Sequence, residues 1–412
     1  MRYLIIGNSA AGLFGLKAIR ETDPAGEIVL LSDERGPAYS RCMTTHYIAG
    51  RVSEKQMYLE AEEFYRHFDI DARFDTAVTK VDPVQRKITC LSGDDISFDR
   101  LLIATGASPV IPDIPGIHAE GVYTLRTLED ARSIKQRALT GANVVVLGGG
   151  PVGLKTAYAL LQRGMQVSVV AKSPQILSQS MDAAGANLIQ IHLEEKGMRF
   201  YLEQNVNEIL TGSQGAVRAV KLDDHNELPC SMVIAGKGVR PNTKFLGADF
   251  KINKGIVTNN YLETNQTGIY AAGDVTETFD MALGNIRVNA TWPNAAAQGR
   301  LAGRNMAGYR DCYAGSLSLN SLEFFGLCAA TAGISNAKGP EYEVLESKDI
   351  PGRRYRRLVF RDQCLVGYVA VNDVDGVGAL TARIKAKAPV KDKKALLARR
   401  LPIMGDWACS AV

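Results

Sequence analysis

The sequence has no run of eighteen consecutive apolar residues, so it offers no candidate for a helix that crosses a membrane. Its first residues, Met1–Gly7, run directly into a strand pattern and contain no apolar signal-peptide segment. Aromatic residues make up only 7% of the chain, and neither a recognised nucleic-acid motif nor a series of interleaved aromatic residues is present. We therefore expect a cytoplasmic protein that binds neither a membrane nor a nucleic acid.

Cysteine is scarce, and no two cysteines have the CxxC spacing of zinc or dithiol sites. Their odd number and scattered positions also give no disulfide framework, which fits a compartment that keeps thiols reduced. We expect no metal site and no structural disulfide. The 7 cysteines are Cys42, Cys90, Cys230, Cys312, Cys328, Cys364 and Cys409.

Positive charge is concentrated near the C-terminus. The whole chain of 412 residues has a net charge of +4, whereas residues 351–400 contain 13 Lys and Arg against 4 Asp, a net charge of +9. Two interpretations stay open: a solvated basic face followed by a charged tail, or a docking surface for an acidic partner. With 46% hydrophobic residues, the chain is long enough for two or three globular domains with sizeable cores.

The N-terminal segment follows the order strand, glycine turn, helix and strand. These four parts are Tyr3–Ile6, Gly7-Asn8-Ser9-Ala10-Ala11-Gly12, Leu13–Arg20 and Glu27–Leu31. Asp33 and Glu34 stand about twenty residues beyond the turn, where a Rossmann unit carries the acid that binds an adenosine ribose. Ser9 replaces the middle glycine, which normally lets the backbone approach a pyrophosphate.

A second, intact copy of the same pattern begins at Asn143. A buried-strand run at Asn143–Leu147 precedes Gly148-Gly149-Gly150-Pro151-Val152-Gly153, and a helix at Leu154–Arg163 and a strand at Gln166–Ala171 follow. The N-terminus of each helix offers unpaired N–H groups and a partial positive charge to a pyrophosphate. Two complete units make a purely structural role for both turns improbable, so we predict two dinucleotide sites.

Further motifs in a fixed order resemble a known family. They are Ala104-Thr105-Gly106-Ala107-Ser108-Pro109, Gly238-Val239-Arg240-Pro241-Asn242 and Ile269-Tyr270-Ala271-Ala272-Gly273-Asp274-Val275. With the two turns, the chain resembles the flavoproteins of the pyridine nucleotide-disulfide oxidoreductase superfamily. Tyr39-Ser40-Arg41, Leu125-Arg126-Thr127, the segment from Trp292-Pro293-Asn294-Ala295 to Asn305-Met306-Ala307-Gly308 and the segment Asn320–Leu327 resemble the branch of rubredoxin reductases, ferredoxin reductases and the nitrite reductase large-subunit flavodomain.

The resemblance implies an FAD site around the first turn. Gly7 and Gly12 would lie at the pyrophosphate, Asp33 or Glu34 on the adenosine ribose, and Asp274 on the ribityl chain. Arg41 and Arg126 would lie on the phosphate or near the ring, and Trp292 and Pro293 would cover the flavin neighbourhood. The complete predicted FAD set is Gly7, Ser9, Ala10, Ala11, Gly12, Asp33, Glu34, Arg41, Ala104, Thr105, Gly106, Arg126, Gly273, Asp274, Trp292 and Pro293.

The second turn is expected to bind NADH or NADPH. The strand that ends at Ala171 continues into Lys172-Ser173 and lacks the carboxylate that accepts from a ribose 2′-hydroxyl and repels a 2′-phosphate. NADPH is therefore permitted, and Lys172 and Ser173 are candidates to hold its extra phosphate. The choice between NADH and NADPH stays open. The predicted residues are Gly148, Gly150, Pro151, Val152, Gly153, Lys172 and Gly238.

Three residues form the candidate catalytic group: Cys42, His46 and Lys155. Relatives usually carry a lysine at the position of His46 and a glutamate at that of Lys155, so the acid of their ion pair is absent here. Cys42 occupies the position of the redox cysteine of NADH oxidases and coenzyme A-disulfide reductases. A helix start, Arg41 and His46 would each lower its pKa. It is either redox-active or a small inert side chain, and Lys155 either faces the site or points to solvent.

The order of the motifs predicts an α/β fold with one Rossmann-like domain inserted in another. We expect an FAD domain at 1–113 and 243–313, an NAD(P) domain at 114–242 and an α+β C-terminal domain at 314–412, because Gly273-Asp274 returns after the second turn. Cys328 and Cys409 are assigned structural roles in the last domain. The resemblance also allows a homodimer.

The resemblance implies an NAD(P)H oxidoreductase, with three alternatives for the step after flavin reduction. The first is an electron transferase that reduces a rubredoxin, a ferredoxin or another acidic iron-sulfur protein near the basic C-terminal region. The second is a Cys42-dependent reductase of a disulfide, coenzyme A-disulfide or persulfide. The third is a flavin- and NAD(P)H-binding redox-signalling protein. An oxidase is disfavoured because the first turn lacks the histidine usual in NADH oxidases.

Overall fold

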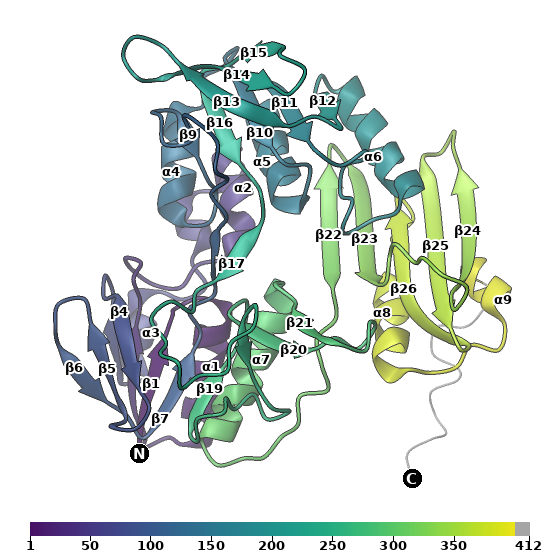
Figure 1. The fold of residues 1–412 in the computed structure, drawn as a ribbon. Coiled ribbons are helices and arrows are strands. Elements are labelled where there is room, and N and C mark those ends of the chain that lie inside the picture. Colours follow the sequence, from purple (N-terminus) through teal and green to yellow (C-terminus); the bar gives the residue numbers. More distant parts are fainter. Residues whose placement is uncertain (400–412) are drawn as a thin grey trace.

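The computed structural model describes residues 1–399. It contains two bodies built on parallel sheets and a third built on an antiparallel sheet, which lies on the right in Figure 1. The predicted α/β fold with two Rossmann-like units and a C-terminal α+β unit is confirmed. Cys409 and the last cation of the basic window, Arg400, lie outside the described residues.

The first sheet is entirely parallel and contains both strands predicted near the N-terminus. Its order is β19 (Ile269–Ala271), β7 (Arg100–Ile103), β1 (Arg2–Ile6), β2 (Glu27–Leu31) and β3 (Ile70–Arg73). Strand β19 comes from a segment that follows the whole second sheet in sequence, and it pairs beside β7. The motif that ends in Asp274 therefore joins the first sheet.

Alternating side chains of the first sheet are buried on both faces, as expected of parallel strands. Ile5 packs with Leu16 on the side of α1 (Ala10–Thr22) and α7 (Trp292–Met306). Leu4 packs with Val81 on the opposite side, beneath a meander of β4 (Val78–Asp82), β5 (Lys87–Cys90) and β6 (Asp95–Ser97). The short helix α3 (Glu62–His67) precedes β3.

The second sheet repeats this plan. Its order is β12 (Arg199–Leu202), β11 (Gln166–Ala171), β10 (Asn143–Leu147), β16 (Met232–Ala235) and β9 (Val122–Tyr123). One face carries α4 (Leu128–Arg137), α5 (Pro151–Gln162) and α6 (Ala183–Glu195). The other carries β13 (Val206–Thr211), β14 (Val217–Leu222) and β15 (Glu227–Pro229).

The third sheet is antiparallel and shares a hydrophobic core with the second body. Its order is β22 (Leu319–Phe324), β23 (Leu327–Gly333), β26 (Cys364–Val371), β25 (Arg354–Arg361) and β24 (Glu343–Asp349). Phe324 and Val369 pack with Leu193 of α6 on one face. Helices α8 (Val377–Ala386) and α9 (Lys393–Leu397) contact the same sheet, and Leu380 of α8 packs with Leu358.

A short segment after β2 reaches across to the second body. It comprises the 3₁₀ helix η1 (Arg41–Met43), helix α2 (Thr44–Ile48) and the 3₁₀ helix η2 (Glu54–Met57). Ile48 is fully buried with Leu154 of α5, so α2 is fixed against the second sheet's helices. This packing brings Cys42 and His46 to the helix that carries Lys155.

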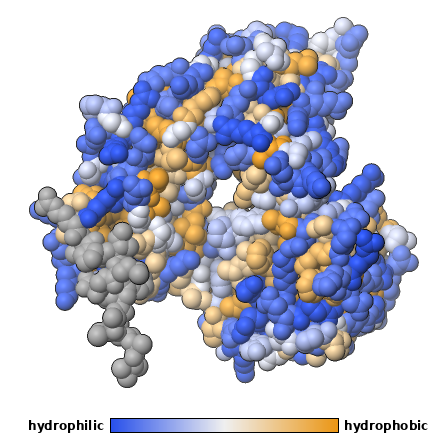
Figure 2. Space-filling model, turned by 180° about the vertical axis from the view of Figure 1, so that it is seen from behind, coloured by the Kyte–Doolittle hydropathy of each residue, from blue (hydrophilic) through white to orange (hydrophobic). Residues whose placement is uncertain are grey.

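The remaining short strands form two small sheets. Strand β8 (Ala107–Pro109) pairs with β17 (Val239–Pro241), and β20 (Thr276–Phe279) pairs with β18 (Ile256–Val257) and β21 (Ile286–Val288). Seen from behind, the surface is largely hydrophilic and is hollowed near the centre, where the three bodies meet (Figure 2). Within residues 1–399, no helix is both long and apolar enough to span a bilayer.

Candidate active site

The first glycine turn is held by two close backbone contacts. Gly7 has φ of +110°, and a Cβ there would lie 2.3 Å from the Ala104 carbonyl oxygen. A Cβ on Gly12 would lie 1.8 Å from the carbonyl oxygen of Gly7. Only glycine fits at both positions, and the turn delivers the N-terminus of α1, with Ala10 and Ala11 buried in its first turn, to the carboxyl end of the sheet.

The second turn has the same construction and more open space. A Cβ on Gly153 would lie 2.2 Å from the Gly148 carbonyl oxygen, while a Cβ on Gly150 would meet nothing within 4 Å. Gly150 is the N-cap of α5, and Pro151 begins the helix with Val152 exposed beside it. Gly238 has φ of +90° and lies in the segment that follows β16. The open position at Gly150 fits a pyrophosphate oxygen against the backbone.

Arg41 is the centre of a hydrogen-bond network at the first turn. Its guanidinium donates to the Ser9 hydroxyl at 3.3 Å, to the Tyr39 hydroxyl at 3.1 Å and to the Arg126 carbonyl oxygen at 2.8 Å. It also forms an ion pair with Glu34. The structure thus brings together Ser9, Glu34, Arg41 and Arg126, which the sequence predicted separately.

The two candidate ribose acids differ in their partners. Glu34 is bound to Arg41 and accepts a hydrogen bond from the Tyr39 hydroxyl at 2.5 Å. The adjacent Asp33 has no hydrogen bond or ion pair with another side chain among the described residues, and its side chain is exposed at the sheet edge. Partial removal of its carboxylate from water raises the pKa of Asp33, and the negative charge of Glu34 raises it further. Asp33 therefore keeps its oxygens available to a ligand hydroxyl.

A second ion pair joins two predicted motifs. The Arg126 guanidinium lies 3.0 Å from the Asp274 carboxylate, and both side chains are largely buried. Gly106, which with Ala104 and Thr105 follows β7, comes close enough that a Cβ would lie 3.0 Å from this guanidinium. The N–H of Gly273 donates to the Gln298 side-chain oxygen at 2.7 Å.

The N-terminus of α7 lies beside the same sheet edge. Gly299 of α7 packs so closely on α1 that a Cβ would lie 2.1 Å from the Ala11 carbonyl oxygen. Trp292 is half-buried against the first core, whereas Pro293 is exposed. Both residues belong to the first turn of the helix, on the side of the molecule where Gly273 lies.

Cys42 is exposed in η1, and its environment differs from the one predicted. Burial of its surroundings raises the pKa of the Cys42 thiol, and the positive charge of Lys155 only partly opposes this effect. The predicted lowering of this pKa is therefore wrong. Of the three predicted causes only the backbone N–H at the helix start acts on the thiol, through the N–H of Cys42, and its effect is outweighed by burial. The Arg41 guanidinium pairs with Glu34, and the charge of Asp274 also raises the pKa of the Cys42 thiol.

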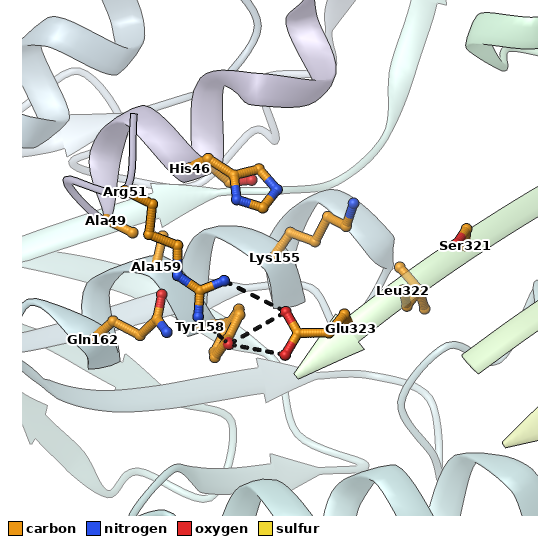
Figure 3. A pocket seen from close by; sticks show the side chains of 11 residues that line it. His46, Ala49, Arg51, Lys155, Tyr158, Ala159, Gln162, Ser321, Leu322 and Glu323 are labelled. Carbon is orange, nitrogen blue, oxygen red and sulfur yellow. Dashed lines mark hydrogen bonds and ion pairs between the residues drawn. The ribbon is translucent and has the colours of Figure 1, made fainter. Parts of the chain in front are cut away.

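His46 and Lys155 face a common cavity of about 180 Å³ between α2, α5 and β22 (Figure 3). Burial lowers the pKa of His46, and the charges of Lys155 and Arg51 lower it further. Neither His46 nor Lys155 has a hydrogen-bond or ion-pair partner through its side chain in residues 1–399. Lys155 lines the cavity, which favours the interpretation that it faces the site. The cavity is also lined by Thr45, Ala49, Arg51, Tyr158, Ala159, Gln162, Ser321, Leu322 and Glu323.

Sequence reasoning missed the network at the other end of this cavity. Arg51 donates to the Tyr158 hydroxyl at 2.6 Å and lies 3.4 Å from the Glu323 carboxylate. One residue of this network comes from the segment after α2, one from α5 and one from β22. Glu323 lies inside the segment Asn320–Leu327 that carries the family resemblance, which was the available signal for it.

Lys237 is a second missed residue, at the carboxyl end of the second sheet. Its pKa is lowered by burial and by the nearby positive charge of Lys172, and its ammonium lies 3.5 Å from the Asn205 side-chain oxygen. Lys172 itself is exposed just after β11, and the Ser173 hydroxyl donates to the Gln175 carbonyl oxygen. The sequence signal was the position of Lys237 immediately before Gly238.

Much of the basic C-terminal region is paired with acids. Arg353, Arg356, Arg357, Lys393 and Arg399 each form ion pairs, with Glu195, Asp373, Glu346, Glu343 and the Asp373–Asp375 pair respectively. Arg383 is buried. The exposed cations of the region that form no ion pair in the described part of the chain are Arg354, Lys385, Lys387, Lys391 and Lys394.

Comparison with known proteins identifies the family to which this chain is similar. The family described as pyridine nucleotide-disulphide oxidoreductase matches residues 1–299. The chain belongs to this family. An NADH oxidase of Methanocaldococcus jannaschii is 36% identical over 318 residues, which cover 75% of this chain and 70% of the relative. The NADH-dependent phenylglyoxylate dehydrogenase subunit epsilon of Aromatoleum evansii is 30% identical and covers 93% of this chain and 91% of the relative.

Two further similarities concern proteins with different electron acceptors in their names. The rubredoxin-NAD(+) reductase of Pseudomonas putida is 28% identical over 75% of this chain and 80% of the relative. The solved structure of an NAD-dependent persulfide reductase from A. fulgidus is similar with a TM-score of 0.86 and 26% identity, covering 94% of this chain and 77% of that chain. The predicted family is confirmed, and this pyridine nucleotide-disulphide oxidoreductase is an FAD- and NAD(P)H-dependent enzyme.

Proposed function

We propose that this oxidoreductase passes electrons from NAD(P)H through FAD to an acidic electron-carrier protein, such as a rubredoxin, a ferredoxin or another iron-sulfur protein. The observation that favours this acceptor is the state of Cys42. Burial raises the pKa of the Cys42 thiol, which disfavours the thiolate that a disulfide or persulfide reductase needs as its nucleophile. Similarity to a rubredoxin-NAD(+) reductase supports the same acceptor class.

The FAD site is proposed at the carboxyl end of the first sheet. The N–H groups of α1, with Gly7 and Gly12 giving close backbone approach, would bind the pyrophosphate. Asp33 would accept from the adenosine ribose because Glu34 is committed to Arg41. Asp274, oriented by Arg126, would accept from the ribityl hydroxyls. When bound, FAD supplies the redox chemistry between a hydride donor and a one-electron acceptor.

The NAD(P)H site is proposed at the second turn. Gly148 and Gly153 shape the turn, and Gly150 leaves space for the pyrophosphate at the N-terminus of α5. Lys172 and Lys237 would attract the negative charge of the nucleotide near its adenosine ribose, which favours NADPH. The domain boundaries 1–113 with 243–313, 114–242 and 314–412 remain part of this proposal.

The docking surface for the carrier is proposed on the exposed, unpaired cations of the C-terminal region. Lys385, Lys387, Lys391 and Lys394 lie on or beside α8 and α9 and carry no ion pair in the described residues. Such a patch steers an acidic protein and gives an association rate that falls as salt screens the charges.

The test combines an anaerobic titration with carrier assays. We expect NADH or NADPH to deliver two electrons per FAD, and the reduced enzyme to reduce rubredoxin or ferredoxin at a rate that falls with ionic strength. Replacing the four lysines by glutamine should lower kcat/KM about tenfold or more at low salt while FAD reduction is unchanged. A rate insensitive to salt, or unchanged in the variant, would contradict the docking proposal.

A second candidate is a Cys42-dependent disulfide or persulfide reductase. Its support is the exposed position of Cys42, the opposing effect of Lys155 on its pKa and the similarity to an NAD-dependent persulfide reductase. In this case Cys42→Ser should abolish persulfide turnover with FAD retained, and the anaerobic titration should take up four electrons per FAD. Unimpaired turnover in the variant would exclude this candidate.

A further inference from the structure

We propose that the cavity between α2, α5 and β22 binds a small oxyanion, namely a free carboxylate or phosphate or the same group on a small metabolite. The cavity lies at the junction of all three bodies and has a volume of about 180 Å³. This anion site goes beyond the proposed electron transfer, because neither glycine turn is part of its wall.

The wall of the cavity follows from helical spacing. Lys155, Tyr158, Ala159 and Gln162 are separated by three and four positions and lie on one face of α5. Residues of α2 face them in the same way, and β22 closes the space with Ser321–Glu323. The site is large enough for a small oxyanion with bound water, since one water takes about 30 Å³ in the liquid.

The charge of the wall is predominantly positive. Arg51 and Lys155 are the cations of the wall, His46 adds a positive charge when it is protonated, and Glu323 is the one acidic residue among the lining side chains. The carboxylate of Glu323 is already engaged, because it accepts from the Gly326 N–H at 2.6 Å and is paired with Arg51. It also lies 3.4 and 3.5 Å from the Tyr158 hydroxyl. The charge of Glu323 also raises the pKa of His46, but burial and the charges of Lys155 and Arg51 outweigh this effect.

Lys155 and His46 are left as unmatched donors. Both are only partly exposed, and no described side chain or carbonyl accepts a hydrogen bond from either (Figure 3). A charge held away from bulk water without a partner costs free energy that an anion would offset. The Thr45 and Ser321 hydroxyls and the Gln162 amide supply further polar groups around the same space.

Anion binding should be coupled to protonation of His46. The groups that face His46 are Arg51, Lys155 of α5 and Glu323 of β22, with the Tyr158 hydroxyl beyond them. Two of these are cations that disfavour an imidazolium, and an anion among them would reverse that effect. Binding should therefore raise the pKa of His46 and grow stronger as pH falls through that pKa.

The experiment uses the FAD-loaded protein and follows the imidazole proton resonance of His46 by NMR. The chain has 5 histidines, so His46→Gln assigns the signal. Inorganic phosphate and acetate are titrated at constant ionic strength with sodium chloride as the balancing salt. We expect a saturable shift, an increase in the His46 pKa and tighter binding at lower pH. A shift that never saturates, or that chloride reproduces equally, would overturn the proposal.

Two variants and a control locate the site. Lys155→Gln and, separately, Gln162→Glu should each weaken phosphate binding about tenfold or more, which corresponds to about 1.4 kcal/mol. Lys385→Gln on α8 removes one exposed positive charge elsewhere and should leave the affinity unchanged. Equal affinity in all four proteins would overturn the site. Gln162→Glu keeps every cavity cation and so remains informative if Lys155→Gln does not fold.

The same samples separate this proposal from the proposed function. FAD content and anaerobic reduction by NADPH report on the two dinucleotide sites, whereas the His46 resonance reports on the cavity. The titration is repeated with NADP⁺ present, and phosphate binding that persists identifies a separate anion site. Complete competition would mean that the cavity belongs to the nucleotide site and would overturn the separate site.

Discussion

The carboxyl ends of the two parallel sheets are built on the same glycine turn but differ in their charges. At the first sheet, Glu34 pairs with Arg41 and Asp274 pairs with Arg126, so positive and negative groups are matched. At the second sheet, Lys172 lies close enough to lower the pKa of Lys237, and neither lysine forms an ion pair with a residue of the described range 1–399. A network in which each charge is already paired is rigid before its ligand binds. Cations that have no acidic partner gain the most electrostatic stabilisation when an anionic ligand binds.

This difference suits the two ligands assigned to the sites. A cofactor that stays bound is best held by a preorganised network whose groups are already oriented. A nucleotide that must enter and leave is better attracted by charge, because screening and exchange keep such binding reversible. Substitutions at the two sites can test whether the first is held by paired charges and the second by unpaired cations. The substitution with the largest expected effect comes first.

Gly12→Ala should have the largest effect on the fold. The added Cβ would lie 1.8 Å from the Gly7 carbonyl oxygen, so α1 must move away from β1. We expect a loss of about 3 kcal/mol or more in the free energy of unfolding, measured by urea denaturation, together with loss of bound FAD.

Gly150→Ala is a contrasting variant at the second turn, at the position that Ser9 occupies in the first. Its Cβ meets nothing within 4 Å, so stability should change by only about 1 kcal/mol or less. FAD should remain bound, while the affinity for NAD(P)H falls because the methyl group occupies the space in front of α5. Destabilisation by Gly150→Ala as large as that by Gly12→Ala would mean that the space described at Gly150 is not open.

Arg126→Gln should weaken the first site through the loss of one ion pair. Its partner Asp274 would be left largely buried and unpaired, at a cost of about 2 kcal/mol in the free energy of unfolding. FAD should also dissociate more readily, as measured by fluorescence of the released flavin. A double-mutant cycle with Asp274→Asn should show the coupling directly.

An exposed ion pair provides the control for this variant. Arg137 and Glu120 are separated by 3.3 Å, but their side chains are 39% and 65% exposed. Arg137→Gln should therefore cost about 0.5 kcal/mol or less. If Arg126→Gln cost no more than Arg137→Gln, the matched network would not be a source of rigidity.

Lys237→Gln should reduce the preference of the second site for NADPH over NADH. We expect KM for NADPH to rise about tenfold and KM for NADH to change much less, because a charged hydrogen bond to the 2′-phosphate is lost. Lys172→Gln should act in the same direction. Equal effects on both nucleotides would show that these lysines do not recognise the 2′-phosphate.

The wild-type protein should also show a pH dependence that follows from Lys237. Burial and Lys172 lower the pKa of Lys237, so its ammonium loses the proton at a lower pH than an ordinary lysine does. NADPH affinity should therefore be full below this pKa and decline as pH rises through it. Lys172→Gln removes one cause of the lowered pKa and should move the decline to higher pH.

The sequence was sufficient for the parts of this molecule that depend on local pattern. Both turns, their flanking strands and helices, and the return of Gly273-Asp274 to the first sheet follow from motif order and from the close contacts that only glycine permits. The partners of Arg41 were not predictable in detail, because Ser9 and Arg126 come from segments far from it in the chain.

The features that the sequence missed depend on packing between bodies. The cavity at His46 exists because α2 leaves the first body and packs on α5, while β22 approaches from the third. The wrong prediction for the Cys42 pKa has the same origin. Chain proximity placed Arg41 beside the thiol, but the fold directs its guanidinium to Glu34 and buries the surroundings of Cys42.

The smallest expected effect concerns the reactivity of the Cys42 thiol. Because its pKa is raised, alkylation by iodoacetamide at neutral pH should be slower than at the exposed Cys312 and should accelerate as pH rises toward that pKa. Lys155 opposes the increase, so Lys155→Gln should slow alkylation about threefold further at a given pH. Peptide mass spectrometry separates the two cysteines, and Lys385→Gln is the control for loss of one charge. Faster alkylation of Cys42 than of Cys312 at neutral pH would show that Cys42 is a thiolate. That result would favour the persulfide reductase over the reductase of a carrier protein.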